Sequence, residues 1–299
     1  MKLLCTDLDR TLLPNGEQIE SALARPLLWH MLNTHDIKLA YVSGRDLGRV
    51  LDAIDEYGLQ VPDIIVADVG SSIYLPEKNG SWVNSEEWQS TIETDWKGLT
   101  GDDIKSLLDE VDGLTRQEPS RQSLLKTSYY FSLDADRELL RRRVKNELQS
   151  RNVNASLIMS DDLEKQVGLL DVLPRQATKS GAVSFIRAML GIAQVDTLFA
   201  GDSGNDVAAL VSGVASVAVA NADADTREAI KRDSVSLGTS DSTFQAMGGL
   251  PVAGNVELNG NYAAGILEGL MHFRPVWQSD LLEPHWVASA LARYPLGKE

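Results

Sequence analysis

The sequence predicts an α/β protein with a parallel sheet, interrupted by an inserted α+β segment. Short apolar runs alternate with stretches of helical periodicity at the start of the chain, which is typical of strands joined by crossover helices. Between residues 84 and 167 the order changes, and charged helix faces accompany the strands. The first pattern returns at residue 168. We therefore expect a Rossmann-like core formed by residues 1–83 and 168–275, an α+β domain at 84–167 and a C-terminal extension at 276–299.

The individual elements follow from apolar spacing and turn signals. In the opening segment, strands are predicted at 3–6, 38–42 and 63–67, and helices at 19–32 and 46–57. Asn79-Gly80 between alternating segments predicts a β-hairpin. The inserted segment is predicted to contain helices at 85–96, 100–111 and 134–149 and strands at 124–133 and 155–159.

The last part of the chain returns to strand-and-helix alternation. An apolar run at 168–173 leads to a helix capped by Thr178 and ending near Leu190. Further elements are expected in the order strand 195–200, helix 207–211, final strand 216–220 and helix 226–232. In the extension, apolar residues such as Trp286 suggest an amphipathic helix, which we expect to pack on the core rather than to mediate self-association.

Length and composition limit the class of protein. A chain of 299 residues, 43% hydrophobic, suggests about two domains with a sizeable core. The formal net charge of −15 argues against nucleic acid or an anionic membrane as a partner. A single cysteine, Cys5, fits a reducing compartment, and no apolar stretch has the length of a membrane span. We expect a cytoplasmic protein.

Asp7 and Asp9 follow the first predicted strand and are the candidate catalytic pair. Residues two apart in an extended segment face the same side, with Cα atoms roughly 7 Å apart. Two carboxylates this close need a cation between them or a shared proton. With a divalent ion, Asp7 can attack phosphorus while Asp9 exchanges protons with the leaving oxygen and water. An acidic turn after a strand is the alternative.

Two further segments offer groups for a phosphate. Ser43-Gly44 follows the second predicted strand, so a hydroxyl and backbone N–H groups can approach an oxyanion there, although Ser-Gly is also a common turn. Lys179 falls in the first turn of a predicted helix, where the helix dipole disfavours a cation. This mismatch suggests a nearby anion such as Asp7 with a bound phosphate, and an exposed lysine is the alternative.

The segment 201–206 is the candidate metal loop. It reads Gly-Asp-Ser-Gly-Asn-Asp and follows a predicted buried strand. Asp202 and Asp206 supply the hard oxygen ligands that Mg²⁺ prefers, and phosphate and water can complete an octahedron. Because ligands bind beyond the carboxyl ends of parallel strands, we expect this loop to meet Asp7, Asp9 and Ser43.

Lys126 is the unusual charge of the inserted segment, because it lies in an apolar strand beside Ser128 and Tyr129. It either extends to a solvated edge or reaches a ligand between the domains. Arg141, Arg142 and Arg143 are interpreted as a solvated helix face.

Together, these motifs resemble the haloacid dehalogenase (HAD) superfamily of phosphohydrolases in order and spacing. They are Asp7-Leu-Asp9-x-Thr11, Ser43-Gly44, Lys179 and Gly201-Asp202-x-Gly204-Asn205-Asp206. Within it, the chain resembles the sucrose-phosphate phosphatase group through 70–74, Lys126-x-Ser128-Tyr129, 171–179, 264–268 and His272-Phe273. Arg10 and Ser72 depart from that pattern, where a small or amide residue and an acidic residue are expected.

The resemblance implies a HAD core with an α+β cap, and roles for individual residues. The catalytic residues would be Asp7 and Asp9, and the Mg²⁺ ligands Asp7, the Asp9 carbonyl and Asp202, with Asp206 in support. The phosphate-binding residues would be Thr11, Ser43, Gly44, Lys179 and Asn205. The sugar-binding candidates are Tyr74, Lys126, Ser128, Arg175 and Gln176.

The expected function is Mg²⁺-dependent hydrolysis of a phosphorylated disaccharide or glycoside, with sucrose 6-phosphate as the first choice, through an aspartyl-phosphate. Mannosylfructose phosphate and the phosphates of mannosylglycerate and glucosylglycerate are alternative substrates. A phosphosugar mutase and a non-catalytic sugar-phosphate sensor are rival functions. A glycosyltransferase that makes the sugar phosphate is the expected partner upstream.

Overall fold

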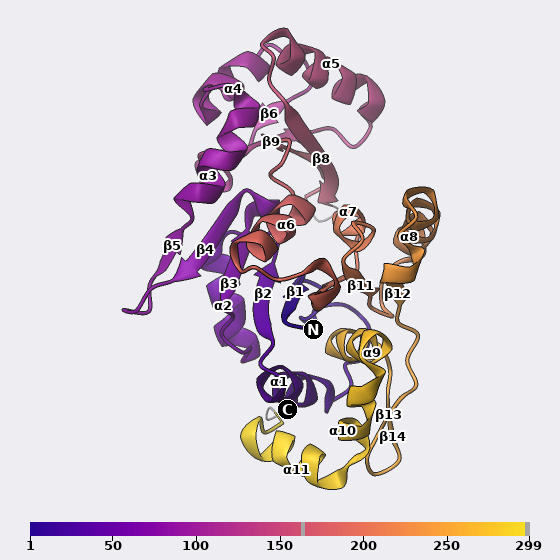
Figure 1. Ribbon diagram of the computed structural model, residues 1–299. Coiled ribbons are helices and arrows are strands. Elements are labelled where there is room, and N and C mark those ends of the chain that lie inside the picture. Colours follow the sequence, from indigo (N-terminus) through magenta and orange to yellow (C-terminus); the bar gives the residue numbers. More distant parts are fainter. Residues whose placement is uncertain (163–164, 297–299) are drawn as a thin grey trace. The chain divides into compact units, whose positions relative to one another are not determined.

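The computed structural model describes residues 1–162 and 165–296, and most of its helices and strands are labelled in Figure 1. These residues form two compact units. The first unit comprises Met1–Ala67 and the chain from Val183 onward, and the second comprises Asp68–Ala182. This division differs from the expected boundaries at 84 and 167, because both the hairpin after residue 67 and the strand at 168 belong to the second unit.

The first unit is built on a parallel sheet with the strand order β12-β11-β10-β1-β2-β3. Its strands are β1 (Leu3–Thr6), β2 (Lys38–Val42), β3 (Ile64–Ala67), β10 (Thr197–Gly201), β11 (Ala215–Ala218) and β12 (Thr243–Gln245). All residues of β1, β3 and β10 are buried, as expected for parallel strands covered on both faces. The predicted α/β class with a parallel-sheet core is confirmed.

Helices flank this sheet. They are α1 (Ala24–Thr34), α2 (Leu47–Tyr57), α7 (Val207–Leu210), α8 (Ala224–Leu237) and α9 (Ala263–Phe273). Two of them, α2 and α8, begin at side-chain caps. Helix α2 begins where the Asp46 carboxylate accepts the Arg49 N–H, and it ends at Gly58 with a φ of 59°. The first helix starts at Ala24 rather than at residue 19, because Asn259 donates to the Ile19 carbonyl and holds that stretch in an irregular path.

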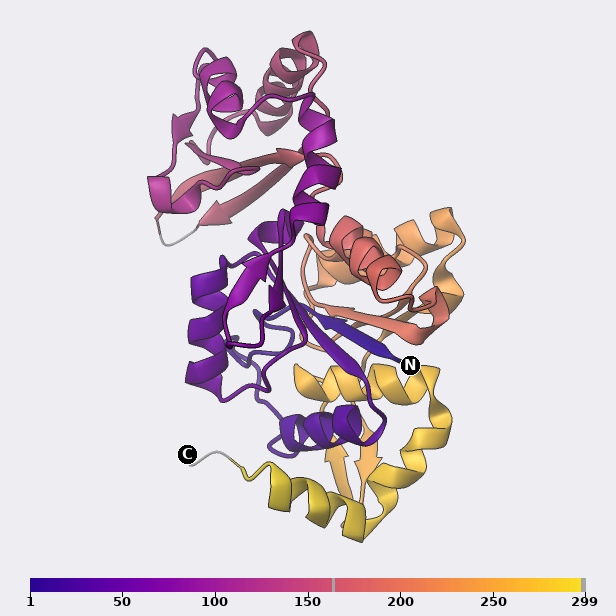
Figure 2. The ribbon, with the colours of Figure 1, turned by 60° about the vertical axis from the view of Figure 1, so that its left-hand side comes forward.

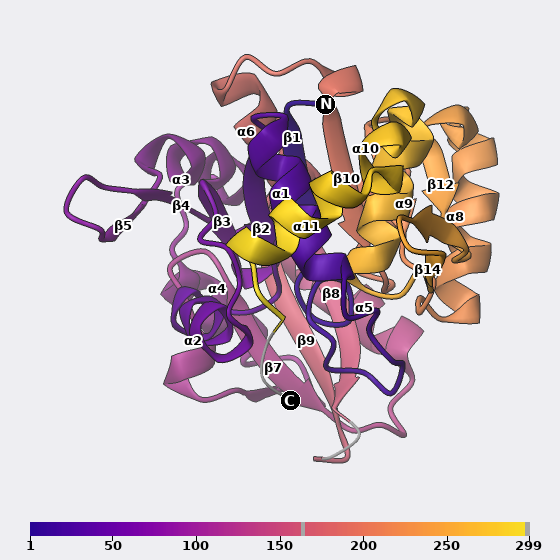
Figure 3. The same cartoon turned by 90° about the horizontal axis from the view of Figure 1, so that it is seen from below.

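The C-terminal extension packs on the first unit, as predicted. Helices α10 (Gln278–Leu282) and α11 (Pro284–Arg293) follow a small antiparallel pair, β13 (Leu250–Val252) and β14 (Val256–Leu258). Helix α11 lies against α1 in the view from below (Figure 3). Leu281 and Ala290 are fully buried, and Trp277 stacks on His35 with ring centroids 4.1 Å apart. Burial of this apolar face stabilises the extension on its own unit.

The second unit contains a hairpin, an antiparallel sheet and helices. Strands β4 (Ser72–Pro76) and β5 (Trp82–Asn84) form the predicted hairpin, and Gly80 at its turn has a φ of 86°. The sheet has the order β6-β7-β9-β8, from Thr115–Arg116, Thr127–Phe131, Val167–Pro174 and Ala155–Asp162. Helix α3 spans Glu86–Glu93, and α4 (Gly101–Leu108) and α5 (Arg137–Ser150) lie on one face of the sheet (Figure 2). Helix α6 (Lys179–Met189) leads back into the first unit.

Two predicted strands form, but their positions in the sheets differ from those expected. The run at 168–173 forms part of β9, which pairs with β7 and β8 instead of opening the second part of the core. Buried and half-buried residues alternate along β9, as in an antiparallel strand with only one covered face. The strand at 216–220 is not the final one, because β12 follows it at the edge of the parallel sheet. Short edge strands such as β12 give little periodicity for prediction.

Candidate active site

Strands β1 and β10 place two carboxylates side by side at the carboxyl end of the parallel sheet. The strands pair in register, and the Asp7 N–H continues the ladder by donating to the Ala200 carbonyl at 2.9 Å. Asp7 follows β1 directly and Asp202 follows β10 directly. Both are buried, with 5% and 1% of their surface exposed. The expectation that strand ends bring these two residues together is met within the first unit.

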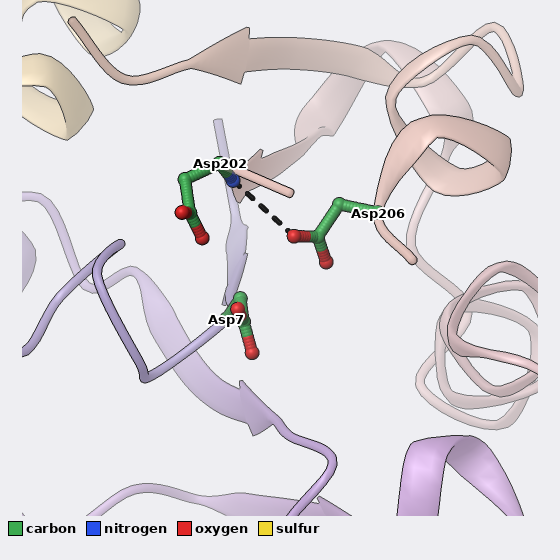
Figure 4. Close-up of side chains that lie close together, drawn as sticks. All are labelled: Asp7, Asp202 and Asp206. Atoms are coloured by element: carbon green, nitrogen blue, oxygen red, sulfur yellow. Dashed lines mark hydrogen bonds between the residues drawn. The ribbon is translucent and has the colours of Figure 1, made fainter. Parts of the chain in front are cut away.

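Asp206 completes an acidic cluster with Asp7 and Asp202 (Figure 4). Each residue contributes one carboxylate oxygen, and these oxygens all lie within 4.8 Å of one another. Asp206 is fully buried, and its Oδ2 accepts the N–H groups of Asp202 at 3.2 Å and Ser203 at 3.1 Å. These two hydrogen bonds hold the backbone of the loop in place, and they also orient the Asp206 carboxylate.

Gly201 makes this arrangement possible. A Cβ at this position would lie 2.6 Å from the Cβ of Asp206, closer than two carbon atoms can pack. The glycine therefore lets the Asp206 side chain approach the end of β10. Gly204 in the same loop has open space where its Cβ would be. Only Gly201 is therefore required by the packing of Asp206, and Gly204 is not.

Thr11 and Arg10 bind the carboxylate of Asp202. The Thr11 hydroxyl, fully buried, donates to Asp202 Oδ1 at 2.9 Å. Arg10 Nε lies 3.5 Å from the other oxygen, Oδ2. Arg10 has a φ of 59°, and Asn221 holds its carbonyl through an Nδ2 donor at 2.5 Å. A left-handed non-glycine backbone that is held by a neighbouring side chain is typical of functional sites.

Asp9 lies at the rim of the first unit and is held by two side chains. Arg45 donates from Nη2 to Oδ1 at 2.6 Å and from Nε to Oδ2 at 2.9 Å. Asn15 donates from Nδ2 to Oδ1 at 2.7 Å. The hydrogen bond with Asp9 raises the pKa of the Arg45 guanidinium. Sequence reasoning missed Arg45 and Asn15, although Arg45 directly follows the Ser43-Gly44 motif.

The remaining phosphate candidates of the first unit lie on neighbouring loops. Ser43 is fully buried, directly after β2, and its hydroxyl oxygen accepts the Arg45 N–H at 3.1 Å. Gly44 is exposed beside it. Because Thr6 of β1 is paired with Tyr41 of β2, Ser43 stands at the same sheet edge as Asp7. Asn205 is exposed on the metal loop and its amide oxygen accepts the Ser203 hydroxyl at 3.0 Å.

Lys126 and Ser128 form a buried polar group inside the second unit. Lys126 is 7% exposed and its Nζ donates to Asp68 Oδ1 at 2.8 Å, so it does not extend to a solvated edge. Ser128 donates to Asp171 Oδ1 at 2.5 Å across the paired strands β7 and β9. Burial raises the pKa of the Asp171 carboxyl, against the lowering effects of Lys126 and of the Ser128 hydrogen bond. The partners Asp68 and Asp171 were not predicted.

The other candidates of the second unit lie on its hairpin and near its C-terminal end. Tyr74 is half-buried in β4. Arg175 and Gln176 are exposed after β9, and the Gln176 N–H donates to Asp95 Oδ2 at 2.8 Å. Lys179 opens helix α6 and is only 2% exposed, so it is not a solvent-exposed lysine. The roles of these four residues in substrate binding stay predictions.

The acidic cluster fits a magnesium ion. Its donors are carboxylate oxygens, which are the ligands that this hard cation prefers. Three buried carboxylates so close together repel one another unless a cation neutralises them. Asp9 was predicted to contribute its backbone carbonyl rather than its carboxylate, which Arg45 and Asn15 hold, and this contribution stays a prediction.

A parallel-sheet core with an acidic cluster at the ends of β1 and β10 defines the class: the protein is a HAD-type phosphoric monoester hydrolase. Residues 1–274 match the model of the family described as sucrose-6F-phosphate phosphohydrolase, and the chain belongs to that family. Within the described residues, no helix combines the length and the apolar character that crossing a bilayer requires.

Two curated relatives and one solved structure are similar to this chain. A putative HAD-like hydrolase of Nitrosococcus oceani is 42% identical over 91% of this chain and 72% of its own length. A mannosylfructose-phosphate phosphatase of Agrobacterium fabrum is 27% identical over 91% of this chain and 97% of its own. The sucrose-phosphatase of Synechocystis sp. PCC6803, solved with sucrose and phosphate, shares the fold with a TM-score of 0.70 and 23% identity, over 91% of this chain and 98% of that one.

Proposed function

We propose that this protein removes the phosphate group from a phosphorylated disaccharide or glycoside, with sucrose 6-phosphate as the first candidate. The observation that carries the proposal is the cluster of Asp7, Asp202 and Asp206 at the carboxyl end of the sheet, in a chain that belongs to the sucrose-6F-phosphate phosphohydrolase family. Inorganic phosphate and the free sugar would be the products.

In the proposed reaction, a carboxylate oxygen of Asp7 attacks phosphorus and the bond to the sugar oxygen breaks. Asp9 gives a proton to the departing oxygen. Water then attacks the phosphorus of the aspartyl-phosphate, Asp9 takes its proton, and the Asp7 carboxylate is restored. Mg²⁺ held by Asp7, the Asp9 carbonyl and Asp202, with Asp206 in support, would supply positive charge to the phosphoryl oxygens. Ser43, Gly44, Asn205 and Lys179 are proposed phosphate contacts. Thr11 is the fifth candidate, and its hydroxyl, which donates to Asp202 Oδ1, would have to turn towards the phosphate.

The contacts of Asp9 fit the base half of its proposed role. Both of its carboxylate oxygens accept hydrogen bonds from Arg45, an arrangement that suits the base form of the residue. To act as the acid, Asp9 has to exchange one of these bonds for a proton. The second N–H donor of Arg45 can keep the side chain in place during that exchange.

Sugar recognition is proposed for the second unit. Lys126 and Ser128 lie among buried polar groups of its sheet, and Tyr74, Arg175 and Gln176 are the other candidate contacts. Mannosylfructose phosphate is the second candidate substrate, because a relative of nearly the same length is named as its phosphatase. Glycosyl transfer onto a sugar phosphate would produce either substrate, so we propose that a glycosyltransferase acts upstream, in the cytoplasm.

A phosphate-release assay over a panel of phosphorylated glycosides tests the proposal. We expect Mg²⁺-dependent release, with the highest kcat/KM for sucrose 6-phosphate. A higher kcat/KM for mannosylfructose phosphate would replace the first candidate by the second. Activity confined to monosaccharide phosphates would overturn the assignment to disaccharides and glycosides.

A further inference from the structure

A basic cavity lies in the second unit, between helix α5 and the edge strand β8. It has a volume of about 470 Å³ and is lined by Arg141 and Lys145 of α5 and by Arg175, which follows β9. No acidic side chain lines it. In a chain with a net charge of −15, three cations around one cavity are a marked local departure. Its size falls within the range of small-molecule sites.

The three cations are not explained by ion pairs within the chain. Among residues 1–162 and 165–296, neither Lys145 nor Arg175 pairs with a carboxylate. Arg141 has only a long contact, 4.0 Å from Nε to Glu138, and its Nη1 donates to the Leu157 carbonyl at 3.1 Å. The helix dipole does not account for them either, because the last turn of α5 contains no basic residue and Arg175 comes from a different segment. The excess positive charge is therefore built from two parts of the chain.

The floor of the cavity is apolar and the walls are polar. Leu148 and Val153 line it and are only 2% and 3% exposed, so the floor is part of the packed interior. Asn154 and Gln149 add amide groups. An apolar floor with a few polar groups and concentrated charge is the usual design of a site for a small organic anion. A bare ion would not need the apolar floor.

The cavity opens on the sheet face opposite the predicted sugar contact Ser128. Leu157, which lines the cavity, is paired with Val172, and Val172 is fully buried under the helices. Ser128 is paired with the next residue, Asp171. Because successive residues of a strand point to opposite faces, Leu157 and Ser128 lie on opposite faces of the sheet.

We propose that this cavity binds a phosphorylated small molecule. A phosphate monoester carries about two negative charges near neutral pH, so it balances three cations better than a single carboxylate does. Guanidinium groups bind phosphate oxygens through paired N–H donors, and Lys145 adds a point charge. The uncharged part of the ligand would cover Leu148 and Val153. The site uses none of the acidic-cluster residues. It shares Arg175 with the proposed sugar contacts, so the test below changes Arg141 and Lys145 and leaves Arg175 in place.

Calorimetric titration of the full chain without Mg²⁺, at fixed ionic strength, tests the proposal with glucose 6-phosphate and inorganic phosphate as probes. The cavity variant is Arg141→Ala with Lys145→Ala. The matched control is Arg142→Ala with Arg143→Ala, which removes equal charge from the same helix at positions that do not line the cavity. We expect the cavity variant to bind glucose 6-phosphate at least about tenfold more weakly and the control to bind within about twofold of wild type.

The other outcomes overturn the proposal. Equal weakening in both double variants would show a general charge effect, and no weakening in either would exclude the cavity. Stronger binding of inorganic phosphate than of glucose 6-phosphate would assign the site to a free ion. Lys145→Glu alone, at an exposed position, repeats the test if loss of the Arg141 bond to Leu157 disturbs folding. Since binding is measured without turnover, failure here leaves the phosphatase proposal intact, and the reverse also holds.

Discussion

Arg45 holds Asp9 by a two-pronged ion pair, with Nη2 2.6 Å from Oδ1 and Nε 2.9 Å from Oδ2. If Arg45 positions Asp9 as a proton donor, its loss should matter most for leaving groups that need a proton. We expect Arg45→Ala to lower kcat/KM for the sugar phosphate about tenfold or more and for p-nitrophenyl phosphate much less, because p-nitrophenolate leaves unprotonated.

Arg49→Ala provides the control for this experiment. Arg49 comes from the same segment, but it pairs with Asp46 instead of Asp9. Its kcat/KM should stay near that of wild type for both substrates. Equal losses on the two substrates in Arg45→Ala would contradict a role for Arg45 through the proton donor.

The metal loop should respond differently to alanine at its two glycines. Gly201→Ala places a Cβ 2.6 Å from the Cβ of Asp206 and should displace that carboxylate. Gly204→Ala meets nothing within 4 Å. We expect the Mg²⁺ concentration for half-maximal activity to rise about tenfold or more in the first variant and to change little in the second, since displacing a group that orients metal ligands costs affinity on that scale. Equal Mg²⁺ dependence in the two variants would count against Asp206 as part of the metal site.

Removing one member of the buried ion pair Lys126–Asp68 should destabilise the protein more than removing both. Their side chains are 9% and 10% exposed, so Lys126→Met leaves a buried carboxylate without its cation. Removing one partner of a buried ion pair costs about 3–5 kcal/mol, so the free energy of unfolding should fall by that order. Adding Asp68→Asn, which tolerates the left-handed φ of 51°, should restore most of it.

Urea denaturation followed by tryptophan fluorescence measures these differences. Trp88 reports on the second unit, since its Nε1 donates to the Gly70 carbonyl beside Asp68 at 3.0 Å. A single Lys126→Met variant as stable as wild type would rule out a structural role for the pair.

Asp171 predicts a pH dependence of stability. Burial raises the pKa of its carboxyl above the ordinary 3.8, so between these two values the folded state binds more protons than the unfolded state. Stability contributed by this group is therefore present at low pH and is lost as the pH rises from 3.8 through the folded pKa. Asp171→Asn has no ionisable carboxyl at this position, so its stability lacks this pH dependence.

The prediction is checked by measuring unfolding midpoints of wild type and Asp171→Asn from about pH 4 to pH 7, the range that spans an ordinary and a raised carboxyl pKa. The stability of the variant relative to wild type should increase with pH over this range. A difference between the two proteins that stays constant or decreases with pH would contradict the raised pKa.

The acidic cluster could be predicted from the sequence because its geometry follows from the fold class. A parallel sheet brings the ends of β1 and β10 to one edge, so Asp7 and Asp202 had to meet once both strands were identified. Asp206 lies only four residues after Asp202 in the same loop, so its side chain was expected near the same site. The contacts that orient these groups could not be predicted in this way. Asn221 lies about two hundred residues from its partner Arg10, and Asp202 lies about as far from its partner Thr11, so no local pattern links them.

The errors in the fold have similar causes. Strand β9 looked like a core strand because its apolar residues form a run, whereas its partner strands are set by long-range pairing. Its one charged residue, Asp171, is the available signal that the strand has an uncovered face. In the second unit, Lys126 was recognised as unusual, but its partner Asp68 lies 58 residues earlier and could not be inferred from spacing.

Single-turnover phosphate release from sucrose 6-phosphate in Mg²⁺ tests whether Asp7 is the nucleophile, with wild type, Asp7→Asn and Asp7→Ala compared. Asp7→Asn keeps the shape of the residue and removes the attacking carboxylate. Both variants should lose at least about a thousandfold in rate while the fold is retained, because covalent catalysis through Asp7 has no substitute. Near wild-type turnover in either variant would contradict it.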